Sequence, residues 1–183
     1  MMVSMFPNYF FFQFQAPNAE ELIEVLEKKE HVVDKNETWG MHHNSSKIYL
    51  EHDHYYPYLS PSLQILTDQL QLKKVDYQMT DIWLNEYQRG DNQELHDHCY
   101  DDLVCVFFLN TGEDFSKFFF YDAHSSSLTK AWKSILPNNT FMPDIKAGDI
   151  MFFPSHMLHG VSPHKSDVIR KTLSVNFNME MRD

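Results

Sequence analysis

Apolar residues recur at helical spacing in two stretches of the N-terminal third, and at strand spacing through most of the remaining chain. The first helical stretch is predicted to begin with a capping box formed by Asn18 and Glu21 and to end near Glu30. The second is predicted to begin with Ser60 as its N-cap and Pro61 in the first helical position. The sequence therefore predicts two amphipathic helices early in the chain.

The pattern changes to β-type after residue 75. Strands are predicted at 77–88, 103–109, 117–121, 150–153 and 173–177. The opening residues 1–15 are predicted to hold one more strand, and 31–58 to be mostly loop, with a short strand near 48–50. Helices followed by a run of strands indicate an α+β protein, mostly β, in which helices pack on one outer face of a sandwich or barrel.

The chain length is typical of one folded domain. With 183 residues, of which 43% are hydrophobic and 15% aromatic, the chain can bury a substantial core. We expect a single domain over 1–183, in which 1–75 supply the N-terminal strand, helices and loop and 76–183 form the β-barrel core.

The charge balance narrows the range of partners. A formal net charge of −11 disfavours general attraction to nucleic acid or to anionic membranes. No apolar segment reaches the roughly 20 residues that a membrane-spanning helix needs. The only cysteines, Cys99 and Cys105, lack the spacing of a redox or zinc pair, so we expect a reducing, cytoplasmic setting.

Histidines supply the candidate chemistry. His96 and His98 are separated by one residue, so in an extended segment both side chains project from one face, and His159 follows later in the chain. Neutral imidazole is a good ligand for iron, zinc, copper or nickel. Cys99 should face the opposite side of the strand, and His164 is expected to be solvated. The pattern predicts a metal site of three histidines.

The stretch GDIMFFPSHMLHGVSPHKSDVIRKTLSVNFN, residues 148–178, resembles the C-terminal signature of iron(II)- and 2-oxoglutarate-dependent oxygenases, particularly their compact phage and bacterial group. Trp83 and Asn85, the HxH motif, and Arg170, Thr172 and Ser174 stand in the order that this group shows. The resemblance implies a double-stranded β-helix, a jelly-roll or cupin-like barrel. It also suggests a bacterial cell or a phage-infected host as the source.

The resemblance implies a second set of residues for the co-substrate. Arg170 and Thr172, two apart on a predicted strand, point to the same side, and a guanidinium can hold a carboxylate with two parallel hydrogen bonds. These two residues are expected to bind the distal carboxylate of 2-oxoglutarate. Asn85 or Tyr87 would lie against the 2-oxoglutarate or the substrate.

The motif departs from the family pattern at one position. These enzymes usually carry an aspartate or glutamate two residues after the first histidine, where this chain has His98. We expect His96, His98 and His159 to be the ligands, with Asp97 in reserve, because a bulge could rotate Asp97 inward and displace His98.

The leading hypothesis is therefore an Fe(II)- and 2-oxoglutarate-dependent dioxygenase. It would use dioxygen, with ascorbate as a supporting reductant, to hydroxylate an unidentified peptide, amino acid or small metabolite. The alternative is a cupin-like isomerase, 2-oxoglutarate-independent dioxygenase or small-molecule binder that would recruit Asp102. A third hypothesis is a metal-free barrel that serves as an interaction module.

Overall fold

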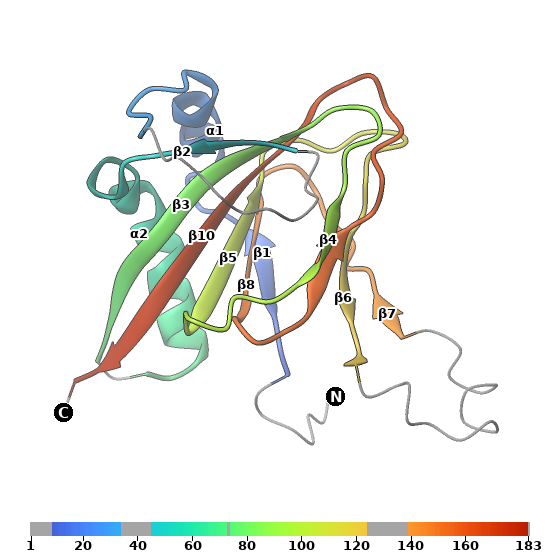
Figure 1. The fold of residues 1–183 in the computed structure, drawn as a ribbon. Coiled ribbons are helices and arrows are strands. Elements are labelled where there is room, and N and C mark those ends of the chain that lie inside the picture. Colours follow the sequence, from blue (N-terminus) through green and yellow to red (C-terminus); the bar gives the residue numbers. More distant parts are fainter. Residues whose placement is uncertain (1–8, 34–44, 73, 124–138, 183) are drawn as a thin grey trace, which may run out of the picture.

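A computed structural model describes residues 9–33, 45–72, 74–123 and 139–182 (Figure 1). The elements in chain order are β1 (Phe12–Gln15), α1 (Ala19–Glu27), β2 (Ser46–Tyr49), α2 (His52–Gln69), β3 (Val75–Tyr87), β4 (Gln93–His96), β5 (Leu103–Phe108), β6 (Phe118–Tyr121), β7 (Thr140–Phe141), β8 (Asp149–Pro154), β9 (His159–Val161) and β10 (Arg170–Met181).

The strands form two antiparallel sheets. The larger sheet has the order β1-β8-β5-β10-β3-β2, and the smaller has the order β4-β9-β6-β7. Both helices lie against one side of the larger sheet, and the smaller sheet lies on its other side (Figure 1). The predicted β fold with helices on one outer face is thereby confirmed, and the arrangement is that of a double-stranded β-helix.

Strand alternation divides the larger sheet into two buried faces. Leu84, Phe107, Phe152 and Leu173 pack against the helices. The intervening residues form the barrel interior with the smaller sheet, in a second core whose buried members are Tyr87, Val104, Val106, Phe108, Phe118, Phe120, Met151, Phe153, Met157 and Val161. Residues that follow one another along a strand therefore belong to different cores.

The long strand β10 fixes this division because it has a paired neighbour on each side. Arg170 pairs with Tyr87 of β3, while Thr172 lies between Asn85 of β3 and Phe108 of β5. Trp83, Asn85 and Tyr87 consequently share the barrel face with Arg170 and Thr172, as the alternation in the sequence predicts.

The predicted strands match β1, β3, β5, β6, β8 and β10 within a few residues, and the predicted short strand matches β2. The short strand β7 was not predicted. A strand that carries His96 and His98 was predicted without bounds, as was a later strand end at His159; β4 ends at His96, and β9 begins at His159. Residues 1–8 of the stretch predicted to hold the N-terminal strand lie outside the described residues.

The start of the second helix was predicted wrongly. Helix α2 begins at His52, not after Ser60, and it continues through Pro57 and Pro61. Tyr55 and Leu59 extend the buried stripe by two turns toward the N-terminus. Burial of these two large side chains outweighs the backbone hydrogen bonds that the prolines cannot donate, so Pro61 did not mark the first turn.

The capping box predicted for α1 is also absent. Asn18 is the N-cap residue, but its side chain makes no cap hydrogen bond. Its Nδ2 donates instead to the backbone oxygen of Tyr58 in α2, at 2.9 Å. A contact between the helices therefore replaces the local cap.

Neither of the two described helices combines the length and apolar character needed to cross a membrane.

The revised start of α2 can be tested with two adjacent substitutions. Leu59→Ala should lower the free energy of unfolding by about 2–5 kcal/mol, because it opens a cavity at a fully buried position beneath α2. Ser60→Ala should be neutral or slightly stabilising, because Ser60 is an exposed residue inside the helix. Urea unfolding measures both values. A loss of about 1 kcal/mol for Ser60→Ala would indicate instead that the helix begins there.

Candidate metal centre

The smaller sheet brings two of the candidate ligands together. Strand β4 follows a turn in which Gly90 has a φ of +94°, a conformation that glycine adopts without strain. β4 ends at His96, which is the antiparallel partner of His159 at the start of β9. The two imidazole centroids are 4.3 Å apart. Residues more than sixty positions apart in the chain thus become neighbours.

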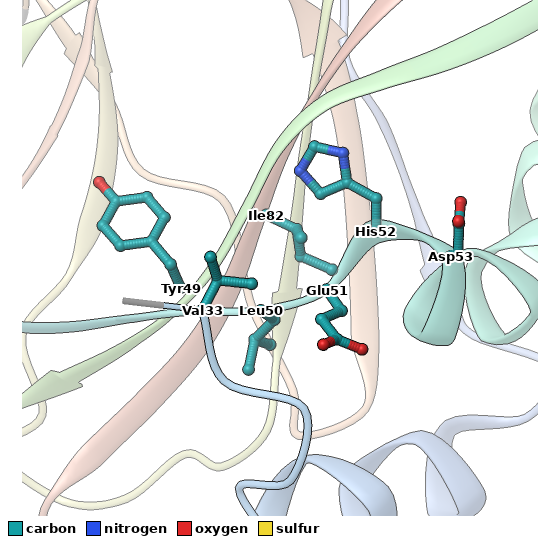
Figure 2. Close-up of a pocket in the computed structure, with 7 residues that line it drawn as sticks. All are labelled: Val33, Tyr49, Leu50, Glu51, His52, Asp53 and Ile82. Carbon is teal, nitrogen blue, oxygen red and sulfur yellow. The ribbon is translucent and has the colours of Figure 1, made fainter. Parts of the chain in front are cut away.

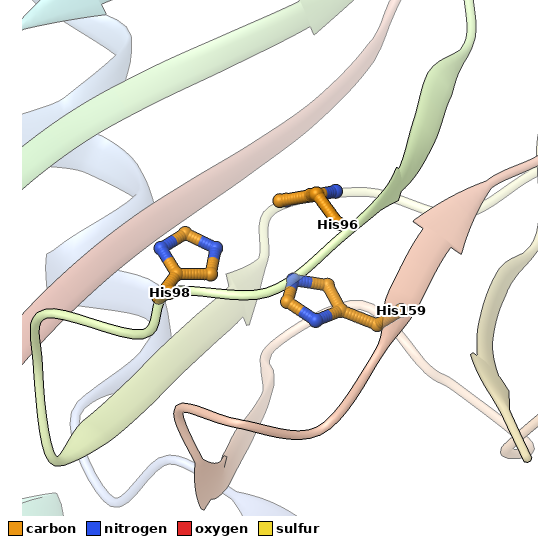
Figure 3. A group of neighbouring side chains, drawn as sticks. All are labelled: His96, His98 and His159. Atoms are coloured by element: carbon orange, nitrogen blue, oxygen red, sulfur yellow. The ribbon is translucent and has the colours of Figure 1, made fainter. Parts of the chain in front are cut away.

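His98 reaches the same place from the loop beyond β4, so it does not lie on the strand predicted to carry it. The backbone N–H of His98 donates to the oxygen of Ser155 at 2.9 Å. Its ring is 5.1 Å from that of His96 and 5.2 Å from that of His159. One ring nitrogen of each histidine lies within 4.8 Å of the others (Figure 3).

Backbone contacts define the tautomers of two of these histidines. His96 Nδ1 lies 2.7 Å from the backbone oxygen of Glu94, and His159 Nδ1 lies 2.8 Å from that of Met157. A carbonyl oxygen can only accept, so each Nδ1 carries the hydrogen. When such a ring is neutral, its Nε2 atom therefore holds the lone pair that a metal requires.

The surroundings keep the imidazoles of His98 and His159 uncharged. Burial, followed by the nearby His96 and Lys47, lowers the pKa of His98 to about 3. Burial and the two other histidines also hold the pKa of His159 well below its usual value. Since a metal competes with protons for imidazole nitrogen, neutral rings are ready to bind it.

The nearby carboxylates do not join this group. Among the described residues, the cluster of potential ligands consists of the three histidines, and Asp97 lies outside it with an exposed side chain. Asp101 accepts hydrogen bonds from Thr80 Oγ1 at 2.6 Å and Asn176 Nδ2 at 2.8 Å. Asp102 accepts one from the backbone N–H of Met179. Asp101 and Asp102 are thus both engaged with the larger sheet.

The predicted co-substrate residues lie together inside the barrel. Arg170 is only 4% exposed, and its Cζ is 4.9 Å from the centre of the Tyr87 ring. Asn85 Nδ2 donates to Ser174 Oγ at 3.0 Å and approaches Thr172 Oγ1 at 3.4 Å, while Asn85 Oδ1 accepts from Trp83 Nε1 at 3.0 Å. Asn85 therefore organises the polar atoms along this face.

Arg170 is a buried cation that lacks an acidic partner among the described residues. Its Nη1 atom is fully buried and has no hydrogen-bond acceptor there. Burial lowers the pKa of Arg170, an effect opposed by Tyr87, and burial raises the pKa of Tyr87. A buried guanidinium without a counter-charge is costly, and an anionic ligand would offset that cost.

A cavity of about 90 Å³ adjoins Arg170. Its walls are formed by Phe108, Asn110, Thr111, Gly112, Phe115, Ser116, Lys117, Phe118, Pro143, Asp144, Ile145 and Arg170. A larger, more open hollow of about 500 Å³ lies where β2 meets α2 (Figure 2), and Val33, Tyr49, Leu50, Glu51, His52, Asp53 and Ile82 line it. None of the predicted site residues contributes to the larger hollow.

Two neighbours of the histidines were not predicted as site residues. The Trp83 ring stacks on that of His98, with centroids 6.0 Å apart, and Lys47 Nζ lies 5.2 Å from the centre of the same indole. Trp83 was interpreted as a core residue. The strand pairing that puts Lys47 opposite Asn85 has no local sequence signal, because it depends on the register of β2 against β3.

His164, which was expected to be solvated, is buried instead. Its Nδ1 accepts a hydrogen bond from the backbone N–H of Ser116 at 3.1 Å, and its Nε2 lies 2.8 Å from the oxygen of Val168. Cys99 is exposed and unpaired, and it does not belong to the ligand group.

Comparisons with known proteins identify the family and the fold. The model of the putative 2OG-Fe(II) oxygenase family matches residues 81–178, which is more than half of the chain. The chain therefore belongs to this family, and it is an oxidoreductase of the 2-oxoglutarate-dependent oxygenase class. No curated protein matches the chain in sequence.

Several solved structures share the fold at low sequence identity. A 2OG-Fe(II) oxygenase family protein from Burkholderia pseudomallei has a TM-score of 0.65 at 11% identity, covering 92% of this chain and 84% of that one. The viral collagen prolyl hydroxylase of Paramecium Bursaria Chlorella virus-1, solved as a 2OG complex, has a TM-score of 0.60 at 11% identity, covering 95% and 98%.

A third solved structure with this fold is that of the epimerase SnoN. Its complex with Fe³⁺, alpha ketoglutarate and nogalamycin RO has a TM-score of 0.64 at 11% identity, covering 94% of this chain and 81% of that one. At these identities the likeness establishes a common fold.

The lowered pKa of His98 predicts how the stability of the metal-free protein depends on pH. In the unfolded chain, His98 takes up a proton near pH 6.5, whereas in the folded protein it stays neutral down to about pH 3. The unfolded state therefore binds more protons within this window, and the free energy of unfolding should fall as the pH falls from about 6.5.

Thermal unfolding of chelator-treated protein between pH 7 and pH 5 measures this effect. The slope of the melting temperature against pH should be smaller in a His98→Gln variant, which cannot titrate at this position. His156→Gln, at an exposed histidine, is the matched control and should keep the wild-type slope. Equal slopes for wild type and His98→Gln would contradict the assigned pKa.

Proposed function

We propose that this protein is an Fe(II)- and 2-oxoglutarate-dependent dioxygenase that hydroxylates a peptide, an amino acid or a small metabolite. One observation carries the proposal. The barrel that brings three imidazole nitrogens within 4.8 Å of one another also buries Arg170, whose Nη1 has no partner among the described residues. The first feature suits a divalent metal and the second suits a carboxylate.

The donor set fits iron(II). His96, His98 and His159 would hold the ion through neutral nitrogens, and three protein ligands leave coordination positions for 2-oxoglutarate and dioxygen. Bound iron would supply the activation of dioxygen that the removal of hydrogen from a C–H bond requires. Because His98 replaces a carboxylate, this site is one unit less negative than a set of two histidines and one acid.

The polar face of the barrel fits the co-substrate. Arg170 would bind the distal carboxylate of 2-oxoglutarate through two parallel N–H groups, with the Thr172 hydroxyl beside it on the same face of β10. Asn85 already bonds to Ser174 and approaches Thr172, so it would orient the hydroxyl groups that meet the ligand. The aromatic ring of Tyr87 would stabilise the guanidinium through a cation–π contact.

The different exposure of the three histidines indicates from which side the ion would be reached. His159 is buried, whereas His96 and His98 are partly exposed, so solvent and substrate would approach from the side of these two residues. The rings of Trp83 and His98 would form one wall of this approach. The other side, which includes Phe118 and Phe153 against His159, is apolar and would exclude water.

Turnover in the absence of a known substrate tests the proposal. Purified protein supplied with iron(II), ascorbate and 2-oxoglutarate under air should form succinate slowly, through uncoupled oxidation of the co-substrate. Succinate can be measured by chromatography, with chelator-treated protein as the control. The proposal fails if no succinate forms under any of these conditions and calorimetry detects no binding of 2-oxoglutarate.

The choice of ligands can be tested separately. His98→Ala should weaken metal binding by at least about tenfold, because it removes one of three ligands. Asp97→Ala is the matched control, and it should leave the affinity unchanged because the Asp97 side chain lies outside the ligand group. Anaerobic titration with iron(II) or cobalt(II) measures both affinities. The reverse result would make Asp97 the third ligand.

A further inference from the structure

Two buried polar atoms without partners line the same cavity. Arg170 Nη1 and Ser116 Oγ are both fully buried and lack a hydrogen-bond partner among the described residues. Arg170 is 4% exposed and Ser116 is 5% exposed, and both contribute to the wall of the cavity of about 90 Å³. Ordinarily such groups are satisfied by protein or water, so two at one cavity indicate a ligand that is polar on this side.

The chemistry of the two groups specifies the ligand. A guanidinium only donates hydrogen bonds, and a serine hydroxyl can donate as well, so a single acceptor with two oxygens would satisfy both. The remaining buried wall is largely aromatic, with Phe108, Phe115 and Phe118. Lys117 and Asp144 also line the cavity, but both side chains are exposed. A carboxylate is the group that matches the two buried donors.

His164 holds Ser116 in a fixed relation to Arg170. Its Nδ1 accepts from the backbone N–H of Ser116, and because the oxygen of Val168 can only accept, Nε2 carries the hydrogen of this neutral ring. Val168 lies two residues before Arg170. One buried imidazole therefore connects the segment that enters β6 to the segment that enters β10.

We infer that Ser116 is a further binding residue for the distal carboxylate of 2-oxoglutarate, in addition to Arg170 and Thr172, and that His164 is a positioning residue for Ser116. This inference rests on the proposed function. Arg170 and Thr172 both belong to β10, whereas Ser116 approaches from the segment before β6 in the smaller sheet. The carboxylate would thus be held from both sheets, which would select co-substrates whose chain carries an acid at its far end.

The inference can be tested with two ligands that differ only at that end. 2-Oxoglutarate and 2-oxopentanoate share the keto acid that would bind the metal, but the second has a methyl group in place of the distal carboxylate. Calorimetry on iron(II)-loaded protein without oxygen measures both affinities. Ser116→Ala should weaken binding of 2-oxoglutarate about 10- to 100-fold, since it removes a hydrogen bond to a charged group, and should leave 2-oxopentanoate unaffected.

Ser62→Ala provides a matched control. Ser62 is a buried serine in α2 whose hydroxyl also has no partner among the described residues, but it lies outside this cavity. Its substitution should change neither affinity. Equal weakening of both ligands by Ser116→Ala would reveal a general structural defect and overturn the inference.

The failure of this inference is distinguishable from failure of the proposed function. One outcome is that the wild type binds 2-oxoglutarate and that Arg170→Met weakens this binding, whereas Ser116→Ala does not. In that case the proposed function stands and the role inferred for Ser116 is wrong. If the wild type itself does not bind 2-oxoglutarate, both are wrong.

Variants of His164 test the positioning role. His164→Leu removes the acceptor for the Ser116 N–H, so it should weaken the binding of 2-oxoglutarate but not that of 2-oxopentanoate. Adding Ser116→Ala to this variant should cause little further loss of affinity. His164→Asn retains an acceptor oxygen near the Nδ1 position and should restore part of the affinity. Full additivity of His164→Leu and Ser116→Ala would contradict the positioning role.

Discussion

The register of β10 between β3 and β5 is the constraint on which the whole arrangement depends. Because side chains alternate along a strand, a shift of one residue would exchange the two faces of the sheet. Arg170 and Thr172 would then enter the helix-facing core, and Leu173 would enter the barrel. The pairing of β10 on both sides, over twelve residues on the β3 side, makes such a shift costly. The register that buries the apolar side chains of β10 against the helices therefore also places Arg170 and Thr172 inside the barrel.

The sequence predicted those features that depend on local spacing. Alternation in β3 and β10 put Asn85, Tyr87, Arg170 and Thr172 on one face, and the structure agrees. Strong β patterns located the long strands for the same reason. Each of these inferences needed only the residues within one strand.

Features that depend on contacts between distant segments were missed. The bounds of the short strands β4 and β9 depend on their mutual pairing, which sets Gln93 opposite Val161 and His96 opposite His159 across the smaller sheet. Helix α2 passes through two prolines because Tyr55 and Leu59 are buried under it, a fact that no helical start signal contains. Likewise, the burial of His164 follows from the convergence of three loops, since it bonds to residues 116 and 168 and its backbone to Asp91.

The turn that carries His98 links the candidate ligands to two different layers of the molecule. His96 and His159 belong to the smaller sheet, whereas the turn after His98 is bonded to the larger one through Asp101 and Asn176 and through the backbone of Asp102 and Phe177. An ion shared by these imidazoles would therefore act as a cross-link between the layers. Its binding energy would add to the stability of the folded barrel, so that metal binding would raise the free energy needed to separate the two layers.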